Sequence, residues 1–154
     1  MKIVAKTDQG KIRKDNQDSF AAGELPGGVV WAVVCDGMGG AAGGSVASQT
    51  AVKMISEKIA SGYQYGMSDK SIKNLLTSVV ESANSSIYEM SCSVESLNGM
   101  GTTVVVSVIR DKELYLVHAG DSRAYRVTKD SITQLTRDHS VVQDMVEHGE
   151  LTEE

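Results

Sequence analysis

Residues 29–44, VVWAVVCDGMGGAAGG, place a single carboxylate between a run of apolar residues and a run of glycines. Residues 29–35 are apolar and rich in valine, which predicts a strand of the fully buried kind. Residues 37–44 have almost no side chains, so the backbone can bend tightly there and its carbonyls can approach an ion closely. An ionised Asp36 at the mouth of a buried strand is costly unless a cation or hydrogen-bond donors compensate it, and a metal ion is the simplest compensation.

The order of the other elements predicts an α+β fold, because helices and strands follow one another without regular alternation. Small and apolar residues recur at helical spacing over residues 44–60, with Gly62 placed to end that helix. A second helix begins near Ser68 or Asp69, either of which can cap it, and continues as one apolar stripe to Met90.

The predicted strands are short, and the turns between the later ones are tight enough to join antiparallel neighbours. The strands cover residues 3–7, 29–35, 102–109, 114–119, 124–127 and 131–135. A last helix is predicted over residues 141–147. We find no internal repeat or domain boundary, so the pattern predicts a single domain over residues 1–154.

The composition is that of a globular protein, with 41% hydrophobic and 23% charged residues. A net charge of −5 without a run of Lys and Arg argues against nucleic acid or an anionic membrane as partner. Cys35 and Cys92 have no CxxC spacing, so neither a disulfide framework nor a zinc site is predicted. No apolar stretch resembles a signal peptide or a membrane span, and we expect a soluble, cytoplasmic protein.

Three acidic residues lie at strand ends or in turns, where proteins commonly present functional groups. They are Asp18 in RKDNQDSF, Asp36 in VVCDGMGG and Asp121 in VHAGDSRAY. Taken alone, each also fits a turn carboxylate without a chemical role. Arg13 precedes Asp18 by five residues, and its guanidinium could clamp a phosphate or lie solvated on the surface.

Two other features have alternative interpretations. The glycine run could be a flexible loop or a phosphate-cradling loop, but it lacks the Lys-Ser/Thr ending of a Walker loop and does not fit GxGxxG. A nucleotide binder stays an alternative, which ATP-dependent thermal stabilisation would favour. Cys35 could suggest a thiol nucleophile, yet it lies in an apolar strand without a Cys-x5-Arg loop, so we expect a buried thiol.

These segments together resemble, in order and spacing, the bacterial members of the PP2C-type (PPM) metal-dependent serine/threonine protein phosphatases. The matching segments are KIRKDNQD (11–18), VVCDGMGGAAGGSVAS (33–48), GMGTTVVVSVI (99–109), LYLVHAGDSRAYRV (114–127) and LTRDHSVVQDMVEHGELTEE (135–154). The resemblance implies a pair of packed antiparallel sheets flanked by helices. It also implies hydrolysis of phosphoserine and phosphothreonine on proteins by water activated at a binuclear Mg²⁺ or Mn²⁺ centre, without a phosphoenzyme.

The resemblance further implies a role for each candidate residue. Asp36 would bridge both ions, and Gly37 would supply a backbone carbonyl to one of them. Asp18 would act near the same cluster largely through bound waters, and Asp121 would help hold a third, weaker ion. Arg13 would clamp the phosphate. Oxygen ligands of this kind suit Mg²⁺ and Mn²⁺, whereas zinc favours His and Cys.

Two departures from the family pattern qualify these expectations. Many eukaryotic relatives have a His where this chain has Met38, which leaves the general acid unassigned. His118 is expected to be a packed sheet residue, and His139 and His148 to lie in a loop and on a helix surface. Relatives also continue into two further Asp motifs, DG followed by D and then DN, and neither occurs here after Asp121.

We therefore expect a phosphatase domain that is incomplete at the C-terminus, binds metal weakly and has little or no activity as a 154-residue chain. An uncovered sheet edge and helix face would favour self-association. The alternative is a non-catalytic pseudophosphatase or interaction module that recognises a phosphoprotein. For the enzyme, the expected partner is a phosphorylated protein substrate, in opposition to a Ser/Thr kinase.

Overall fold

The central element of the fold is an antiparallel sheet of five strands, seen in a computed structural model that describes residues 1–140 and 143. The strands run in the order β1-β2-β4-β5, and the two-residue β3 pairs with the end of β2. Their bounds are β1 Asp18–Leu25, β2 Val29–Met38, β3 Gly101–Thr102, β4 Val104–Arg110 and β5 Glu113–Ala119. A separate hairpin follows, formed by β6 (Tyr125–Val127) and β7 (Ile132–Gln134).

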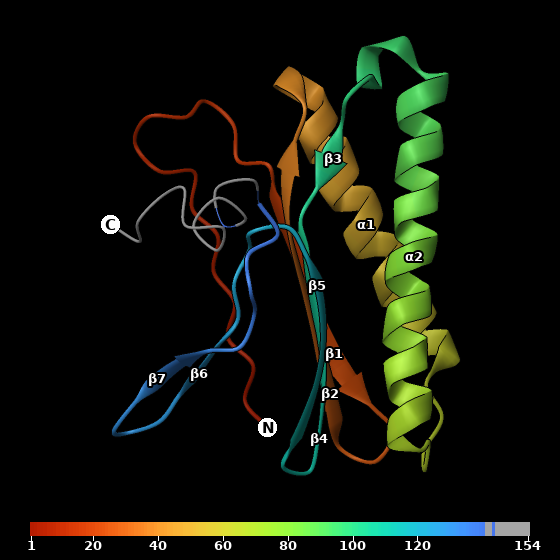
Figure 1. Ribbon diagram of the computed structural model, residues 1–154, viewed down its shortest axis with the longest axis vertical. Helices are drawn as coiled ribbons and strands as arrows, with labels where there is room; N and C mark the ends of the chain where they lie inside the picture. The colour runs from red at the N-terminus through yellow and green to blue at the C-terminus, as the bar shows by residue number, and fades with distance from the viewer. Residues whose placement is uncertain (141–142, 144–154) are drawn as a thin grey trace.

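Two long helices, α1 (Gly40–Gly62) and α2 (Asp69–Ser93), pack side by side against one face of the sheet (Figure 1). Helix α2 begins as predicted, because the Ser68 hydroxyl accepts the Ser71 N–H at 3.2 Å. Its apolar stripe faces the core through Ile72, Leu76, Val79, Ala83 and Ile87. Helix α1 begins at Gly40, four residues before the predicted start at 44, so part of the glycine run is helical. A 3₁₀ turn, Glu95–Leu97, follows α2.

Strand β2 is not buried on both faces, contrary to the sequence-based prediction. Trp31, Val33 and Cys35 are buried toward the helices, whereas Val34 is 47% exposed and Met38 57% exposed on the other face. The reason is that α1 and α2 cover only one face of the sheet, so the side chains alternate between core and surface. Asp36 lies on the uncovered face, in line with Val34 and Met38.

Three further predictions differ from the structure or lie outside it. Residues 3–7 are not a strand, because no strand in the described part of the chain pairs with them. Instead they line a shallow hollow beside Phe20 and Val34 on the uncovered sheet face. The predicted strand 102–109 is divided into β3 and β4 at Thr103. The helix predicted at 141–147 lies outside the described residues except for its position 143.

The remaining strands and their antiparallel connections are confirmed, as is the α+β class. Neither α1 nor α2 is apolar enough along its length to cross a membrane, and this holds for every helix in the described part of the chain. The sheet and helices together bring the ends of β1, β2 and β5 to one end of the sheet, where the candidate acidic residues lie.

Candidate metal centre

Asp18 and Asp36 face each other across two neighbouring strands. Asp18 is the first residue of β1, and the antiparallel register places it directly opposite Asp36 near the end of β2. Opposite residues in an antiparallel pair project to the same face, with Cβ atoms about 4.5–5.5 Å apart. Both side chains are on the exposed face, away from the helices. The structure therefore brings these two predicted site residues together.

The pKa of Asp36 shows that it is unfavourable to place these two carboxylates face to face. Partial desolvation raises the pKa of Asp36 above its ordinary value, and the charge of Asp18 and a shared hydrogen bond with it raise the pKa further. Asp121 adds a smaller effect of the same sign, whereas the guanidinium of Arg13 opposes it. Asp18, Asp121 and Arg13 thus each lie within electrostatic reach of Asp36. A cation bound there would relieve the repulsion between the carboxylates.

The position of Asp18 is fixed by the residue before it. The carbonyl oxygen of Gln17 accepts two hydrogen bonds, from the Gly37 N–H at 3.2 Å and from the buried Ser48 hydroxyl at 2.7 Å. The Gln17 side-chain amide donates to the Gly40 carbonyl at 3.0 Å. One residue therefore ties the start of β1 to the end of β2, to the glycine run and to α1. The sequence motifs do not single out Gln17 or Ser48, although both residues lie within the segments that resemble the family.

Several glycines of the run pack closely against neighbouring parts of the chain. A Cβ atom on Gly37 would lie 2.0 Å from the Gly44 carbonyl oxygen, and one on Gly39 would lie 2.6 Å from Cα of Met100. Gly39 also has a φ of 118°, which other residues rarely adopt. These glycines are required by contacts within the chain. This close packing does not favour the nucleotide-loop interpretation, because the chain already occupies the space next to the Cα atoms of Gly37 and Gly39.

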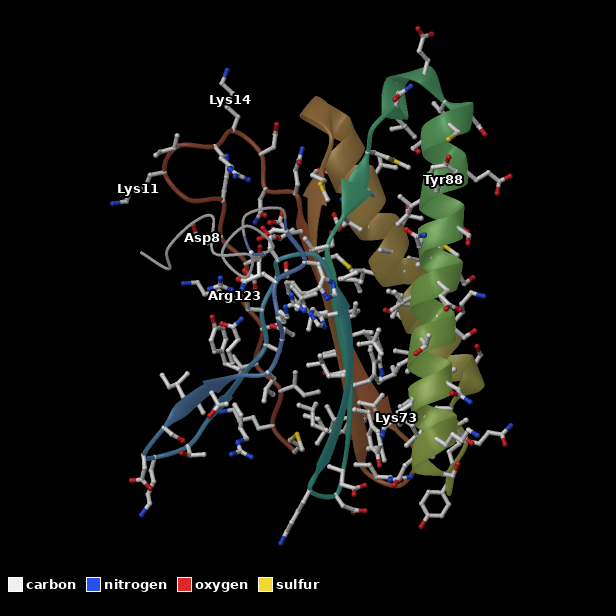
Figure 2. All side chains as sticks on the ribbon, in the orientation of Figure 1. Asp8, Lys11, Lys14, Lys73, Tyr88 and Arg123 are labelled. Carbon is white, nitrogen blue, oxygen red and sulfur yellow. The ribbon has the colours of Figure 1, made fainter. Side chains whose placement is uncertain are left out.

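Arg13 lies in an exposed loop beside the acidic pair. The loop is closed by a hydrogen bond of 2.6 Å between the side chains of Asn16 and Thr7, and the Gln9 amide donates to the carbonyl of Arg13 at 3.0 Å. Lys11 and Lys14 project outward from the same loop (Figure 2). Because the loop has its own hydrogen bonds, it can hold Arg13 within electrostatic reach of Asp36.

Asp121 follows β5 in a turn that begins at Gly120, whose φ is 97°. The segment after β7 returns to this turn, where the His139 N–H donates to the Gly120 carbonyl at 3.0 Å. Arg123 (labelled in Figure 2) and Asp138 form a bidentate ion pair in which the shortest distance is 2.7 Å, and the guanidinium lowers the pKa of Asp138. The Asp121 turn is therefore braced by residues 123–139.

The histidines and cysteines in the described part of the chain take no part in the acidic cluster. His118 is half-buried on β5 and stacks on His139 with ring centroids 4.5 Å apart, which confirms the expected sheet and loop positions. His148 lies outside the described residues. Burial raises the pKa of the Cys35 thiol to about 12, so this side chain is protonated at neutral pH and cannot act as a thiolate nucleophile.

The oxygen donors present fit part of a Mg²⁺ or Mn²⁺ site. Carboxylates, backbone carbonyls and water are the ligands that such hard cations prefer, and Asp18, Asp36 and the adjacent Gly37 offer the first two kinds. Within residues 1–140 and 143, no group of three or more His, Cys, Asp and Glu side chains is arranged to hold an ion. The described residues therefore provide two facing carboxylates with Asp121 farther away, rather than a closed cage.

Comparison with known proteins identifies the family. The family model described as protein phosphatase 2C matches residues 11–148. The chain belongs to the protein phosphatase 2C family. It is 34% identical over 149 residues to the serine/threonine phosphatase stp of Listeria innocua, a match that covers 97% of this chain and 59% of the relative. It is 33% identical to PstP of Mycobacterium tuberculosis over 100% of this chain and 28% of that protein.

Solved protein phosphatase 2C structures share the fold described above. The Streptococcus agalactiae serine/threonine phosphatase superposes with a TM-score of 0.88 at 33% identity, covering 96% of this chain and 60% of that one. The catalytic domain of PstP in complex with two manganese ions has a TM-score of 0.80 at 33% identity, with 96% and 60% covered. The chain thus spans about three fifths of the length of several phosphatases that it matches.

The raised pKa of Asp36 makes its ionisation unfavourable for folding, and we expect Asp36→Asn to remove this effect. When the pKa of an acidic group is raised in the folded state, the free energy of unfolding falls as the pH rises above the ordinary pKa of that group. In metal-free buffer the variant should match the parent chain near pH 3 and exceed its free energy of unfolding at pH 7. For an exposed pair the gain is about 1 kcal/mol or less. Urea denaturation across this pH range measures it, and a less stable variant at pH 7 would contradict the electrostatic account.

The close packing at Gly37 predicts that Gly37→Ala is severely destabilising. Its Cβ would meet a backbone oxygen that cannot move away, and we expect a loss of about 3 kcal/mol or more in the free energy of unfolding. Gly28→Ala is the matched control, because Gly28 has a φ of 73° but no atom within 4 Å of the added Cβ. Backbone strain alone should cost it about 1–2 kcal/mol. Chemical denaturation measures both variants. If Gly37→Ala and Gly28→Ala lose the same free energy of unfolding, the contact with Gly44 does not matter.

Proposed function

We propose that this chain serves the metal-dependent hydrolysis of phosphoserine and phosphothreonine on proteins. The observation that carries the proposal is the facing pair Asp18 and Asp36 in a member of the protein phosphatase 2C family. Support comes from relatives named serine/threonine phosphatases and from PstP, which has been solved with two manganese ions. The substrate is then a phosphoprotein, the product of a Ser/Thr kinase. The free thiols of Cys35 and Cys92 accord with a reducing compartment such as the cytoplasm.

Each site residue has a proposed role within this function. Asp36 and the carbonyl of Gly37 hold Mg²⁺ or Mn²⁺ directly, Asp18 holds it largely through water, and Asp121 helps hold a further ion. Such ions supply an activated water and neutralise the charge of the phosphate. Arg13 clamps the phosphate through its guanidinium and keeps the substrate next to the acidic pair. Met38 has no proton to give, so the leaving oxygen must be protonated from elsewhere.

The strength of metal binding follows from the number of ligands. Two facing carboxylates with Asp121 farther away close no coordination shell in the described residues. We propose that the 154-residue chain binds Mn²⁺ weakly and turns over phosphopeptides slowly. The same observation supports a second candidate, a pseudophosphatase that recognises a phosphoprotein without cleaving it. The two candidates differ in whether a bound phosphopeptide releases phosphate.

Mn²⁺ binding and phosphate release test the proposal together. We expect Mn²⁺ to raise the melting temperature of the parent chain, and Asp36→Asn to abolish the shift because it removes a charged ligand. Arg13→Ala should keep the shift but weaken binding of a phosphothreonine peptide. Thermal unfolding, peptide anisotropy and a phosphate-release assay provide the three measurements. Phosphate release with Mn²⁺, even if slow, favours the enzyme, and peptide binding without release favours the pseudophosphatase.

The control for this experiment is Lys73→Ala, an exposed change on α2 far from the acidic pair (Figure 2). It should behave as the parent in all three measurements. An unchanged Mn²⁺ shift in Asp36→Asn would contradict the proposed metal site. A shift produced by ATP without Mn²⁺ would instead support a nucleotide binder.

We also propose that the 154-residue chain self-associates through exposed apolar residues. Val127 and Ile132 are opposite partners in the β6–β7 hairpin and are 68% and 72% exposed. The double change Val127→Glu and Ile132→Lys should reduce association, because it places opposite charges across the hairpin instead of apolar groups. Light scattering over a concentration series should give a mass that rises above 16.4 kDa for the parent but not for the variant. A parent chain that stays monomeric throughout would refute this.

A further inference from the structure

Thr103 occupies the break between β3 and β4 and is buried, with 5% of its surface exposed. Its hydroxyl oxygen accepts the backbone N–H of Asp36 at 3.0 Å. The same oxygen lies 2.6 Å from the hydroxyl of Ser122, the residue after Asp121. One buried hydroxyl therefore contacts both acidic segments, which are far apart in the sequence.

Two further hydrogen bonds connect residues 102–103 to the backbone of Asp36. The Thr103 N–H donates to the Asp36 carbonyl at 2.9 Å, and the Thr102 hydroxyl donates to the same carbonyl at 3.0 Å. The N–H and the carbonyl of Asp36 are thus both held by residues 102–103. This fixes the backbone from which the Asp36 carboxylate projects.

The Asp121 turn is fitted to the other side of Thr103. A Cβ on Gly120 would lie 2.7 Å from the Thr103 methyl carbon, so only glycine allows the turn to approach this closely. At 2.6 Å the contact between the hydroxyls of Thr103 and Ser122 is in the short range for an O–H···O bond. The Thr103 oxygen already accepts the Asp36 N–H, so its own proton is available for Ser122.

We propose that Thr103 and Ser122 are positioning residues that hold the Asp36 and Asp121 carboxylates at a fixed separation for a divalent cation site. The inference rests on the proposed function, because a fixed separation matters only if both carboxylates serve bound ions. Neither hydroxyl is a ligand in this proposal. They act by holding the backbone of the acidic residues, in the way that outer hydrogen bonds tune metal ligands.

Mn²⁺ affinity tests the proposal with a pair of matched substitutions at Thr103. Thr103→Val keeps the shape and the methyl group against Gly120 but removes the hydroxyl, whereas Thr103→Ser keeps the hydroxyl. We expect the affinity, measured from the electron paramagnetic resonance signal of free Mn²⁺, to fall roughly tenfold or more in Thr103→Val. Thr103→Ser should keep most of the Mn²⁺ affinity of the parent chain. Ser122→Ala, at a half-buried position, should lose part of the affinity that Thr103→Val loses.

The control is Tyr115→Phe, because Tyr115 is also buried and its hydroxyl donates to the Asp69 carboxylate at 2.8 Å, near the β4–β5 turn and away from Asp36 and Asp121. Like Thr103→Val, it should lower the melting temperature, but it should leave the Mn²⁺ affinity unchanged. Equal losses of affinity in Thr103→Val and Tyr115→Phe would show a general effect of stability and overturn the proposal. Equal losses in Thr103→Val and Thr103→Ser would overturn it as well.

If the proposed function is wrong, the result differs, because the parent chain then binds no Mn²⁺. Amide signals in ¹H–¹⁵N spectra of the metal-free chain then decide the inference. Thr103→Val should shift the signals of Asp36 and of both Asp121 and Ser122 by more than Thr103→Ser does. Unmoved signals at Asp121 and Ser122 would show that the hydroxyl pair does not connect the two segments, and would overturn the inference independently of the metal.

Discussion

The pairing register between β1 and β2 is the constraint on which the acidic site depends. Because side chains alternate along a strand, the register that places Asp18 opposite Asp36 sends both carboxylates to the face left free by the helices. A shift of one residue would turn the acidic side chain of one strand toward the apolar layer between sheet and helices. The buried face of β2, with Val33 and Cys35, opposes that shift. The same hydrophobic pattern therefore specifies both the core and the position of the charges.

Two like charges held face to face repel each other, and hydrogen bonds to the main chain keep the two residues in place. Gln17 and Thr103 hold the main chain on either side of the acidic pair through hydrogen bonds of 2.7–3.2 Å. The glycine run packs so closely that no side chain fits at Gly37. These contacts use the main chain rather than the carboxylate oxygens. Support of the backbone from outside the ligand atoms is the arrangement expected of a preorganised ligand set.

Much of this fold could be predicted from local patterns, and the errors have physical causes. The Ser68 cap and the apolar stripe of α2 are local signals that the structure confirms. Strand β1 was missed because its more buried face carries the small residues Ser19, Ala21 and Gly23, with Leu25 as its one large apolar side chain. Residues 3–7 have strand propensity but no strand partner in the described chain. Strand β2 was judged buried on both faces because Ala32 and the exposed Val34 are apolar too. Asp18, Asp36, Asp121 and Arg13 were identified from motifs, whereas the supporting hydroxyl of Thr103 depends on contacts between distant segments that periodicity does not reveal.

The short connection between β1 and β2 has a consequence for how the acidic pair is assembled. Only Pro26, Gly27 and Gly28 separate the two strands, so Asp18 and Asp36 come together by closing a small loop of chain. Closing a small loop costs less conformational entropy than joining segments that are far apart in sequence. Asp121 is added by a long-range contact that must also order both helices between Gly40 and Ser93. The Asp18–Asp36 pair thus belongs to a local hairpin, whereas Asp121 joins it only through the long-range pairing of β2 with β4.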